Sequence, residues 1–170
     1  TFFLEHEIDT GKIIFQETEP ILENDNVGTL YERLMHKGAA LVVKTVRAVE
    51  EENYPQLAQS STETLKAAPK IFKETCEINW HQSAEAVRNF VRGLSPYPTA
   101  WTTLNGKLCK VFSVSVAAPS EAQGEVGHYV TDHKSFLHFK TVNGWVAVEE
   151  LQLEGKKRMM VEEFLRGAKI

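Results

Sequence analysis

Asp9 is the residue of the N-terminal part whose type and position best fit catalysis. It lies in the polar stretch 5–10, two residues before Gly11, and a glycine lets the backbone approach a ligand closely. A carboxylate placed there can accept a proton from an amine nucleophile or hold a histidine in its reactive tautomer. The same carboxylate could instead cap its own turn by accepting a backbone N–H. Spacing alone leaves both interpretations open.

Basic residues of the C-terminal part form a second group of candidates, for contacts with phosphates. The net charge of −4 divides into −6 over residues 1–69 and +2 over residues 70–170, so the second part is the better place for a polyanion. A solvated surface would have the same composition. The candidates are Lys70, Lys73, Arg88, Arg92, Lys107, Lys110, Lys156, Lys157 and Arg158.

Three aromatic residues, Tyr97, Trp101 and Trp145, could stack on nucleic-acid bases, or could pack in a hydrophobic core. Cys76 and Cys109 are isolated from each other and from any paired cysteine motif. We therefore expect two free thiols in a reducing cytoplasm, and no metal site.

The ends and the hydropathy of the chain bear on its location. No apolar run approaches the ~20 residues that a membrane helix needs, and the start of the chain lacks the pattern of a signal peptide. We expect a cytoplasmic protein without a membrane partner. Because the sequence begins within a strand-like pattern and without Met, we also expect it to be a segment of something longer.

The elements that would position Asp9 are two short strands and a helix. Residues 1–4 and 12–16 have strand-like patterns. Thr29 and Glu32 have the spacing of a capping box, and a helix is predicted from there to about residues 50–52. The apolar residues predicted to share one face of that helix are Leu30, Leu34, Leu41, Val42, Val46 and Val49.

Residues 53–69 lack periodicity and indicate an extended linker, and the basic candidates follow it. Ser83 can cap a helix that ends before residues 95–98. Strands are then predicted at 101–104, 108–116, 124–131, 136–142 and 145–153, with Asn–Gly turns at 105–106 and 143–144. A short helix at 161–166 closes the chain. The fold class is α+β, and strands of this number and length are typical of a small OB-like β-barrel.

Several runs in this order resemble the methionyl-tRNA formyltransferase family over essentially the whole chain. Each motif alone is of modest specificity, whereas five in the same order and spacing are specific. The matching runs are 8–11 (IDTG), 70–80 (KIFKE and INW), 92–101 (RGLSPYPTAW), 151–159 (LQLEGKKRM) and 164–167 (FLRG).

The resemblance implies the C-terminal piece of an α/β formyltransferase domain at 1–52, a linker at 53–72, and an OB-like, tRNA-contacting domain at 73–170. It implies formyl transfer from 10-formyltetrahydrofolate, as co-substrate and without a metal, to methionyl initiator tRNA. The full enzyme would be a monomer. Asp9 would be catalytic, and Leu4, Glu5 and Ile8 would represent the floor of the folate pocket. The family's catalytic Asn and His have no counterpart here, which implies that the segment is inactive alone.

Two other functions remain open at this point. One is a related enzyme that uses the same formyl donor on another amine, or that hydrolyses the donor. The other is an RNA-binding barrel without catalytic activity, which residues 1–52 argue against.

Overall fold

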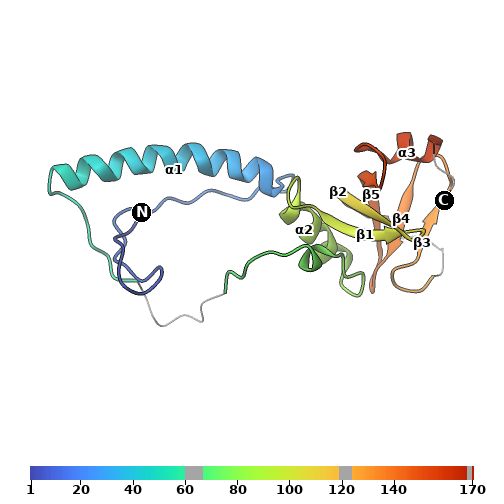
Figure 1. Ribbon diagram of the computed structural model, residues 1–170, viewed down its shortest axis with the longest axis horizontal. Coiled ribbons are helices and arrows are strands. Elements are labelled where there is room, and N and C mark those ends of the chain that lie inside the picture. The colour runs from blue at the N-terminus through green and yellow to red at the C-terminus, as the bar shows by residue number, and fades with distance from the viewer. Residues whose placement is uncertain (60–66, 119–123, 168–169) are drawn as a thin grey trace. The chain divides into compact units, whose positions relative to one another are not determined.

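The computed structural model describes residues 1–59, 67–118, 124–167 and 170. The chain is α+β and forms two compact units. Unit 1 contains residues 1–24 and 29–69, and unit 2 contains residues 25–28 and 70–170. The long helix α1 and the strands of unit 2 are drawn in Figure 1. Within the described residues, no helix combines the length and hydrophobicity needed to cross a bilayer.

Helix α1 (Val27–Glu50) confirms the predicted helix but not its predicted start. The helix begins two residues before Thr29, so the expected capping box is wrong. The backbone N–H of Gly28 in the first turn donates to the carbonyl of Ser95 at 3.1 Å. One of the N–H groups that have no intrahelical partner at a helix start is therefore bonded to a backbone carbonyl.

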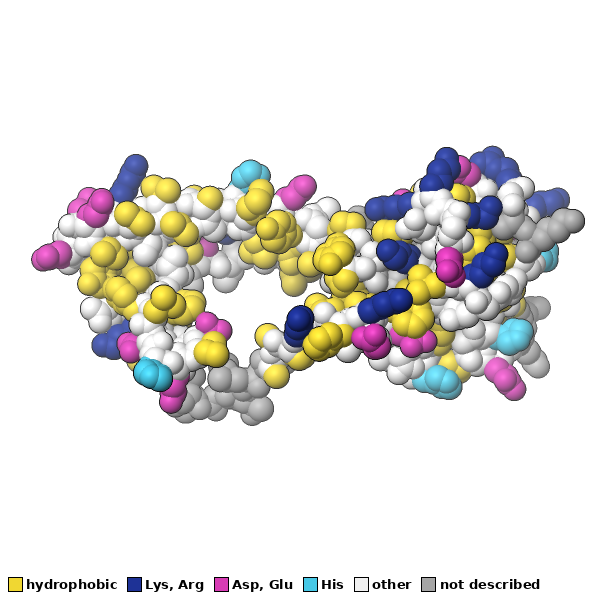
Figure 2. Space-filling model, in the orientation of Figure 1, with side chains coloured by type: hydrophobic (Ala, Val, Ile, Leu, Met, Phe, Trp, Pro, Cys, Tyr) yellow, Lys and Arg dark blue, Asp and Glu magenta, His cyan; other side chains and the backbone are white. Residues whose placement is uncertain are grey.

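Most of the predicted apolar face of α1 is exposed in unit 1, while Leu30 and Leu41 are half-buried. No residue of α1 is buried, and Leu34, Val42 and Val46 are 46%, 53% and 51% exposed. Apolar side chains are visible along this helix in Figure 2. The extended segment beside α1 instead contacts polar positions, since the hydroxyls of Thr1 and Thr45 are 2.8 Å apart.

The strands predicted at 1–4 and 12–16 are wrong. Only isolated bridges occur there, between Phe2 and Ile13 and between Ile13 and Leu57. The two segments share a few backbone hydrogen bonds, from the N–H of Phe3 to the carbonyl of Lys12 at 3.1 Å and from that of Ile14 to the carbonyl of Thr1 at 2.9 Å, but within the described chain these do not form a named strand. The linker predicted over 53–69 lies partly outside the described residues; its described parts, 53–59 and 67–69, contain no helix or named strand.

Unit 2 is built on one antiparallel sheet, with strand order β1-β2-β5-β4-β3 and β6 paired to β5. The sheet curls, and the hydroxyl of Tyr129 on β3 lies 2.9 Å from the side-chain oxygen of Asn105 after β1. The strands are β1 (Ala100–Leu104), β2 (Lys107–Ala117), β3 (Tyr129–Thr131), β4 (Leu137–Lys140), β5 (Trp145–Leu153) and β6 (Met159–Met160).

The predicted hairpin at Asn105–Gly106 is confirmed. Both residues have positive φ, 49° and 76°, which is the requirement of a two-residue turn of this kind. The strand predicted at 124–131 is shorter than expected and begins at Tyr129, because residues 126–127 form a turn in which Gly127 has a φ of 86°. Residues 119–123 lie outside the described part.

Three short helices accompany the sheet. Ser83 caps α2 (Ala84–Leu94) as predicted, accepting the N–H of Ala86 at 3.2 Å. Helix α2 packs on β1, β2 and β5, and α3 (Val161–Gly167) packs on β5 and β6. A 3₁₀ turn, η1 (Glu74–Cys76), was not predicted. The core contains Trp145 and Phe139, and Phe139 stacks on Trp80 with ring centroids 4.4 Å apart.

Candidate functional site

A hollow of about 420 Å³ on unit 2 brings together aromatic and basic side chains that are distant in the sequence. We name it the aromatic hollow. It lies between the segment leading into η1, the loop before β1, and the first hairpin. Its described lining residues, none of them acidic, are Ile71, Phe72, Lys73, Cys76, Tyr97, Pro98, Thr99, Trp101, Leu108 and Lys110.

Trp101 forms a fixed wall of the aromatic hollow. Its indole N–H donates to the backbone oxygen of Lys73 at 2.8 Å, and its own carbonyl accepts the N–H of Ile78 at 2.8 Å. The ring is half-buried and packs against the hydrophobic core. These contacts attach segment 73–78 to β1, so the position of the indole is set by the fold itself.

Tyr97 presents the most exposed aromatic ring of the aromatic hollow. Its side chain is 83% exposed, and it lies between Pro96 and Pro98, whose rings restrict the backbone. The loop is anchored by Thr99, whose hydroxyl donates to the carbonyl of Pro96 at 2.6 Å and whose N–H donates to the carbonyl of Leu94 at 2.9 Å. The ring therefore projects into solvent from a constrained loop.

Three of the predicted basic residues lie in or beside the aromatic hollow. Lys73 and Lys110 line it, and Lys110 is the cross-strand partner of Trp101. The ammonium of Lys70 lies 5.4 Å from the ring centroid of Phe72. All three lysines are exposed, and none has an ion-pair partner within the described ranges. Their charges are therefore available to an anion.

A second, smaller hollow of about 230 Å³ extends this surface and shares Lys110 with the aromatic hollow. It also contains Gln152, whose amide donates to the carbonyl of Lys156 at 2.9 Å, and one acidic residue, Glu154. Figure 2 shows Lys and Arg side chains over the visible face of unit 2, with apolar side chains between them.

The other predicted basic residues line neither hollow. The guanidinium of Arg88 pairs with Glu85 at 3.1 Å. Arg92 donates to the side chain of Asn89 at 2.7 Å and to the carbonyl of Asp25 at 3.4 Å. The ammonium of Lys157 is 3.2 Å from the carboxylate of Glu163, and Arg158 pairs with Glu150 at 2.5 Å. Lys107 is exposed at the start of β2.

Asp9 lies in an exposed turn of unit 1 with a φ of 58°. The side-chain amide of Gln59 donates to the carbonyls of Asp9 and Gly11 at 2.8 and 2.7 Å. No residue of the described chain donates to the Asp9 carboxylate or pairs with it. Gly11 serves the chain's own packing, because a Cβ there would lie 1.6 Å from the carbonyl oxygen of Phe3.

The residues predicted for a folate pocket are also exposed in unit 1. Leu4 and Ile8 are 90% and 89% exposed, and Glu5 is exposed as well. Among described residues of the whole chain, no group of three or more His, Cys, Asp or Glu side chains has the arrangement of a metal site.

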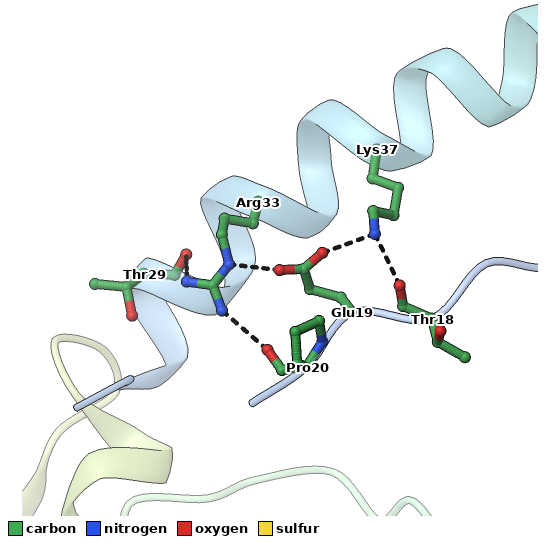
Figure 3. Close-up of polar contacts among 6 residues, drawn as sticks. All are labelled: Thr18, Glu19, Pro20, Thr29, Arg33 and Lys37. Carbon is green, nitrogen blue, oxygen red and sulfur yellow. Dashed lines mark hydrogen bonds and ion pairs between the residues drawn. The ribbon is translucent and has the colours of Figure 1, made fainter. Parts of the chain in front are cut away.

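A charged cluster joins segment 18–20 to α1 (Figure 3). Glu19 accepts from Arg33 at 2.6 Å and pairs with Lys37 at 2.8 Å. Lys37 also donates to the carbonyl of Thr18 at 2.7 Å, and Arg33 to that of Pro20 at 3.1 Å. The hydrogen bond from Lys37, followed by that from Arg33, lowers the pKa of Glu19. This cluster has a structural role in unit 1.

The two cysteines are buried free thiols, as predicted. Burial raises the pKa of Cys109 to about 12, so its thiolate is not available near neutral pH. Trp145 is a core residue that is 2% exposed. Of the three aromatic candidates, the structure therefore leaves Tyr97 and Trp101 for contacts with a ligand.

Comparison with known families identifies the second part of the chain. The profile of the family described as "Formyl transferase, C-terminal domain" matches residues 70–169. The chain belongs to this formyl transferase family. The match covers the α2–α3 region and both hollows, so both are features of a formyl transferase C-terminal domain.

Two curated relatives are similar to this formyl transferase chain over 98% of the chain. The methionyl-tRNA formyltransferase of Azobacteroides pseudotrichonymphae is 44% identical over 98% of the chain and 54% of its own length. That of Bacteroides fragilis is 45% identical, with the same coverage of both proteins. The chain therefore spans about half the length of the curated relatives that it matches.

Solved structures show the same fold at low sequence identity. HypX from Aquifex aeolicus, solved in complex with tetrahydrofolic acid, matches 99% of this formyl transferase chain and 30% of its own, with a TM-score of 0.66 and 18% identity. At this identity the likeness concerns the fold alone.

Proposed function

We propose that this chain is the C-terminal part of a methionyl-tRNA formyltransferase, which transfers a formyl group from 10-formyltetrahydrofolate to the amino group of methionyl initiator tRNA. The observation that carries the proposal is the 44% identity with a methionyl-tRNA formyltransferase over 98% of the chain. The formyl transferase family match over residues 70–169 supports it.

In the proposed domain organisation, residues 1–52 form the end of the catalytic domain, residues 53–72 form a linker, and residues 73–170 form an OB-like domain that contacts tRNA. The antiparallel, curled sheet of unit 2 supports an OB-like architecture. The lysines around the aromatic hollow, which have no ion-pair partner among the described residues, support a phosphate-binding role. They are Lys70, Lys73 and Lys110, and the remaining basic candidates are secondary.

In the proposed reaction the methionyl amine attacks the formyl carbon and a new N–C bond forms, while the bond from that carbon to the folate nitrogen breaks and the folate nitrogen leaves and takes up a proton. The amine loses a proton in this process, and Asp9 is the proposed proton acceptor or the partner of a histidine that accepts it. The exposed Asp9 carboxylate on a turn held by Gln59 supports this role. Leu4, Glu5 and Ile8 would border the folate.

We propose a cytoplasmic, monomeric full-length enzyme and no activity of the 170-residue chain alone. The family's catalytic Asn and His have no counterpart in this sequence, and the chain spans about half of its curated relatives. Loss of such groups typically lowers rates by orders of magnitude.

The test measures incorporation of labelled formyl groups with methionyl initiator tRNA and 10-formyltetrahydrofolate. The full-length protein should formylate the tRNA, and the purified 170-residue chain should not. A full-length protein that formylates only an amino sugar would contradict the proposal in favour of the related-enzyme alternative. Formylation by the 170-residue chain would contradict the proposed inactivity.

A further inference from the structure

We propose that the aromatic hollow binds one unstacked nucleotide of an RNA, with its base against Tyr97 and Trp101 and its phosphates toward Lys73 and Lys110. This inference rests on the proposed function, because it names the RNA feature that unit 2 would recognise. It assigns to this domain a contact with a single-stranded or flipped-out position, in addition to contacts with the phosphate backbone.

The chemistry of the lining favours a nucleotide over other occupants. Three aromatic rings, those of Phe72, Tyr97 and Trp101, lie around a hollow that has two lysines and no acidic residue among its described lining. Proteins that bind unpaired nucleotides combine aromatic platforms for the bases with positive charge for the backbone. RNA recognition in particular uses bases that leave the helix and stack on aromatic side chains. The volume of about 420 Å³ is within the range of small-ligand sites.

The hollow is arranged before any ligand binds. The indole of Trp101 is held by its hydrogen bond to the backbone oxygen of Lys73 at 2.8 Å, and the backbone at Tyr97 lies between two prolines in a loop anchored by Thr99. A ring that is 83% exposed contributes little to the stability of the fold, so the position of Tyr97 fits a role in ligand binding. Ordering of these groups then adds little to the cost of association.

Lys110 connects the proposed base site to the backbone of the RNA. It is the cross-strand partner of Trp101 and also lines the second hollow. A phosphate near Lys110 would therefore lie beside a base in the aromatic hollow, and the next nucleotide could follow the second hollow toward Lys156. The exposed ammonium of Lys70, 5.4 Å from the ring centroid of Phe72, would offer a further charge to the RNA backbone beside Phe72.

The test uses the whole 170-residue chain and two probes: deacylated initiator tRNA, and a single-stranded RNA hexanucleotide followed by the fluorescence of the chain's tryptophans. Tyr97→Ala should weaken hexanucleotide binding by about tenfold, whereas Tyr97→Phe, which keeps the ring, should bind within about twofold of the wild type. Because Tyr97 is exposed, both variants should keep the wild-type melting temperature. The matched control is Tyr31→Ala, which removes a ring that is 65% exposed in unit 1 and should leave binding unchanged.

The outcomes separate this inference from the proposed function. If the chain binds tRNA and Tyr97→Ala binds both probes like the wild type, the nucleotide site is wrong and the proposed tRNA contact stands. If Tyr97→Phe is weakened as much as Tyr97→Ala, the ring does not act by stacking, which also overturns the site. If the wild-type chain binds neither RNA at low salt, the proposed tRNA contact fails together with the site.

Discussion

Replacing Lys70 and Lys73 with alanine should weaken tRNA binding and make it less dependent on salt. Both lysines are exposed and without an ion-pair partner among the residues described, so each can neutralise one phosphate. One such contact contributes about 0.7–0.9 to the slope of log K against log salt concentration, and two contribute about 1.6. Between roughly 50 and 200 mM salt, the affinity advantage of the wild type over the double variant should therefore shrink about ninefold.

The assay for this double variant is titration of the full-length protein with initiator tRNA at several salt concentrations, alongside the KM for tRNA and for the formyl donor. We expect the KM for the donor to be unchanged. Lys134→Ala, which removes an exposed lysine from the turn between β3 and β4, is the matched control. An unchanged slope of log K against log salt concentration in the double variant would refute a phosphate contact at Lys70 and Lys73. A lower slope only in the variant Lys156→Ala/Lys157→Ala would indicate that the contact lies after the end of β5.

Three further predictions concern chemistry and pH. Asp9→Asn in the full-length enzyme should lower kcat by about a hundredfold or more, with a small change in KM, because an amide cannot accept the proton; a near-normal kcat would make Asp9 a turn residue only. Cys109, whose pKa burial raises to about 12, should react with iodoacetamide at pH 8 only after unfolding, and rapid reaction of the native chain would contradict this. The hydroxyl and the N–H of Ser135 hold the pKa of Asp132 well below its usual range. The ionised carboxylate therefore stabilises unit 2 at pH values above 3.8, the pKa of Asp132 in the unfolded chain, and this stabilisation is lost as the pH falls further. Asp132→Asn should flatten the acid dependence of the melting temperature of unit 2, and identical melting curves for variant and wild type would contradict this.

Local signals predicted most of unit 2. The Asn–Gly turn at 105–106 determines a hairpin because both residues tolerate positive φ, and both have it here. Ser83 was identified as a cap from its type and from the apolar spacing that follows, and it does cap α2. These features depend on a few neighbouring residues, and sequence reasoning detects them well.

Features that depend on distant partners were predicted less well. The capping box at Thr29 predicts the wrong boundary, because α1 begins at Val27, and the N–H of Gly28 in its first turn is bonded to the carbonyl of Ser95, a residue far away in the sequence. The segments at 1–4 and 12–16 have strand-like composition, but a strand requires paired neighbours along its length, and within the described chain these segments form isolated bridges, from Ile13 to Phe2 and to Leu57.

The aromatic hollow was only partly predictable. Tyr97 and Trp101 were candidates for stacking, and Lys73 and Lys110 were candidates for phosphate contacts, but the sequence did not indicate that they line one site. The juxtaposition arises because Lys110 and Trp101 pair across β1 and β2, and because the indole holds the backbone at Lys73. The contributions of Ile71, Phe72 and Leu108 to the lining had no signal in the sequence.

The central claim is that unit 2 contacts the tRNA of a formyltransferase through the surface around the aromatic hollow. Hydrogen–deuterium exchange of the full-length protein, with and without initiator tRNA, tests this claim most directly. We expect tRNA to slow exchange in residues 70–78 and 97–111 of unit 2, which contain the aromatic hollow, and to leave exchange in the β3–β4 turn unchanged. Protection confined to residues outside unit 2, with no change at 70–78 and 97–111, would contradict it.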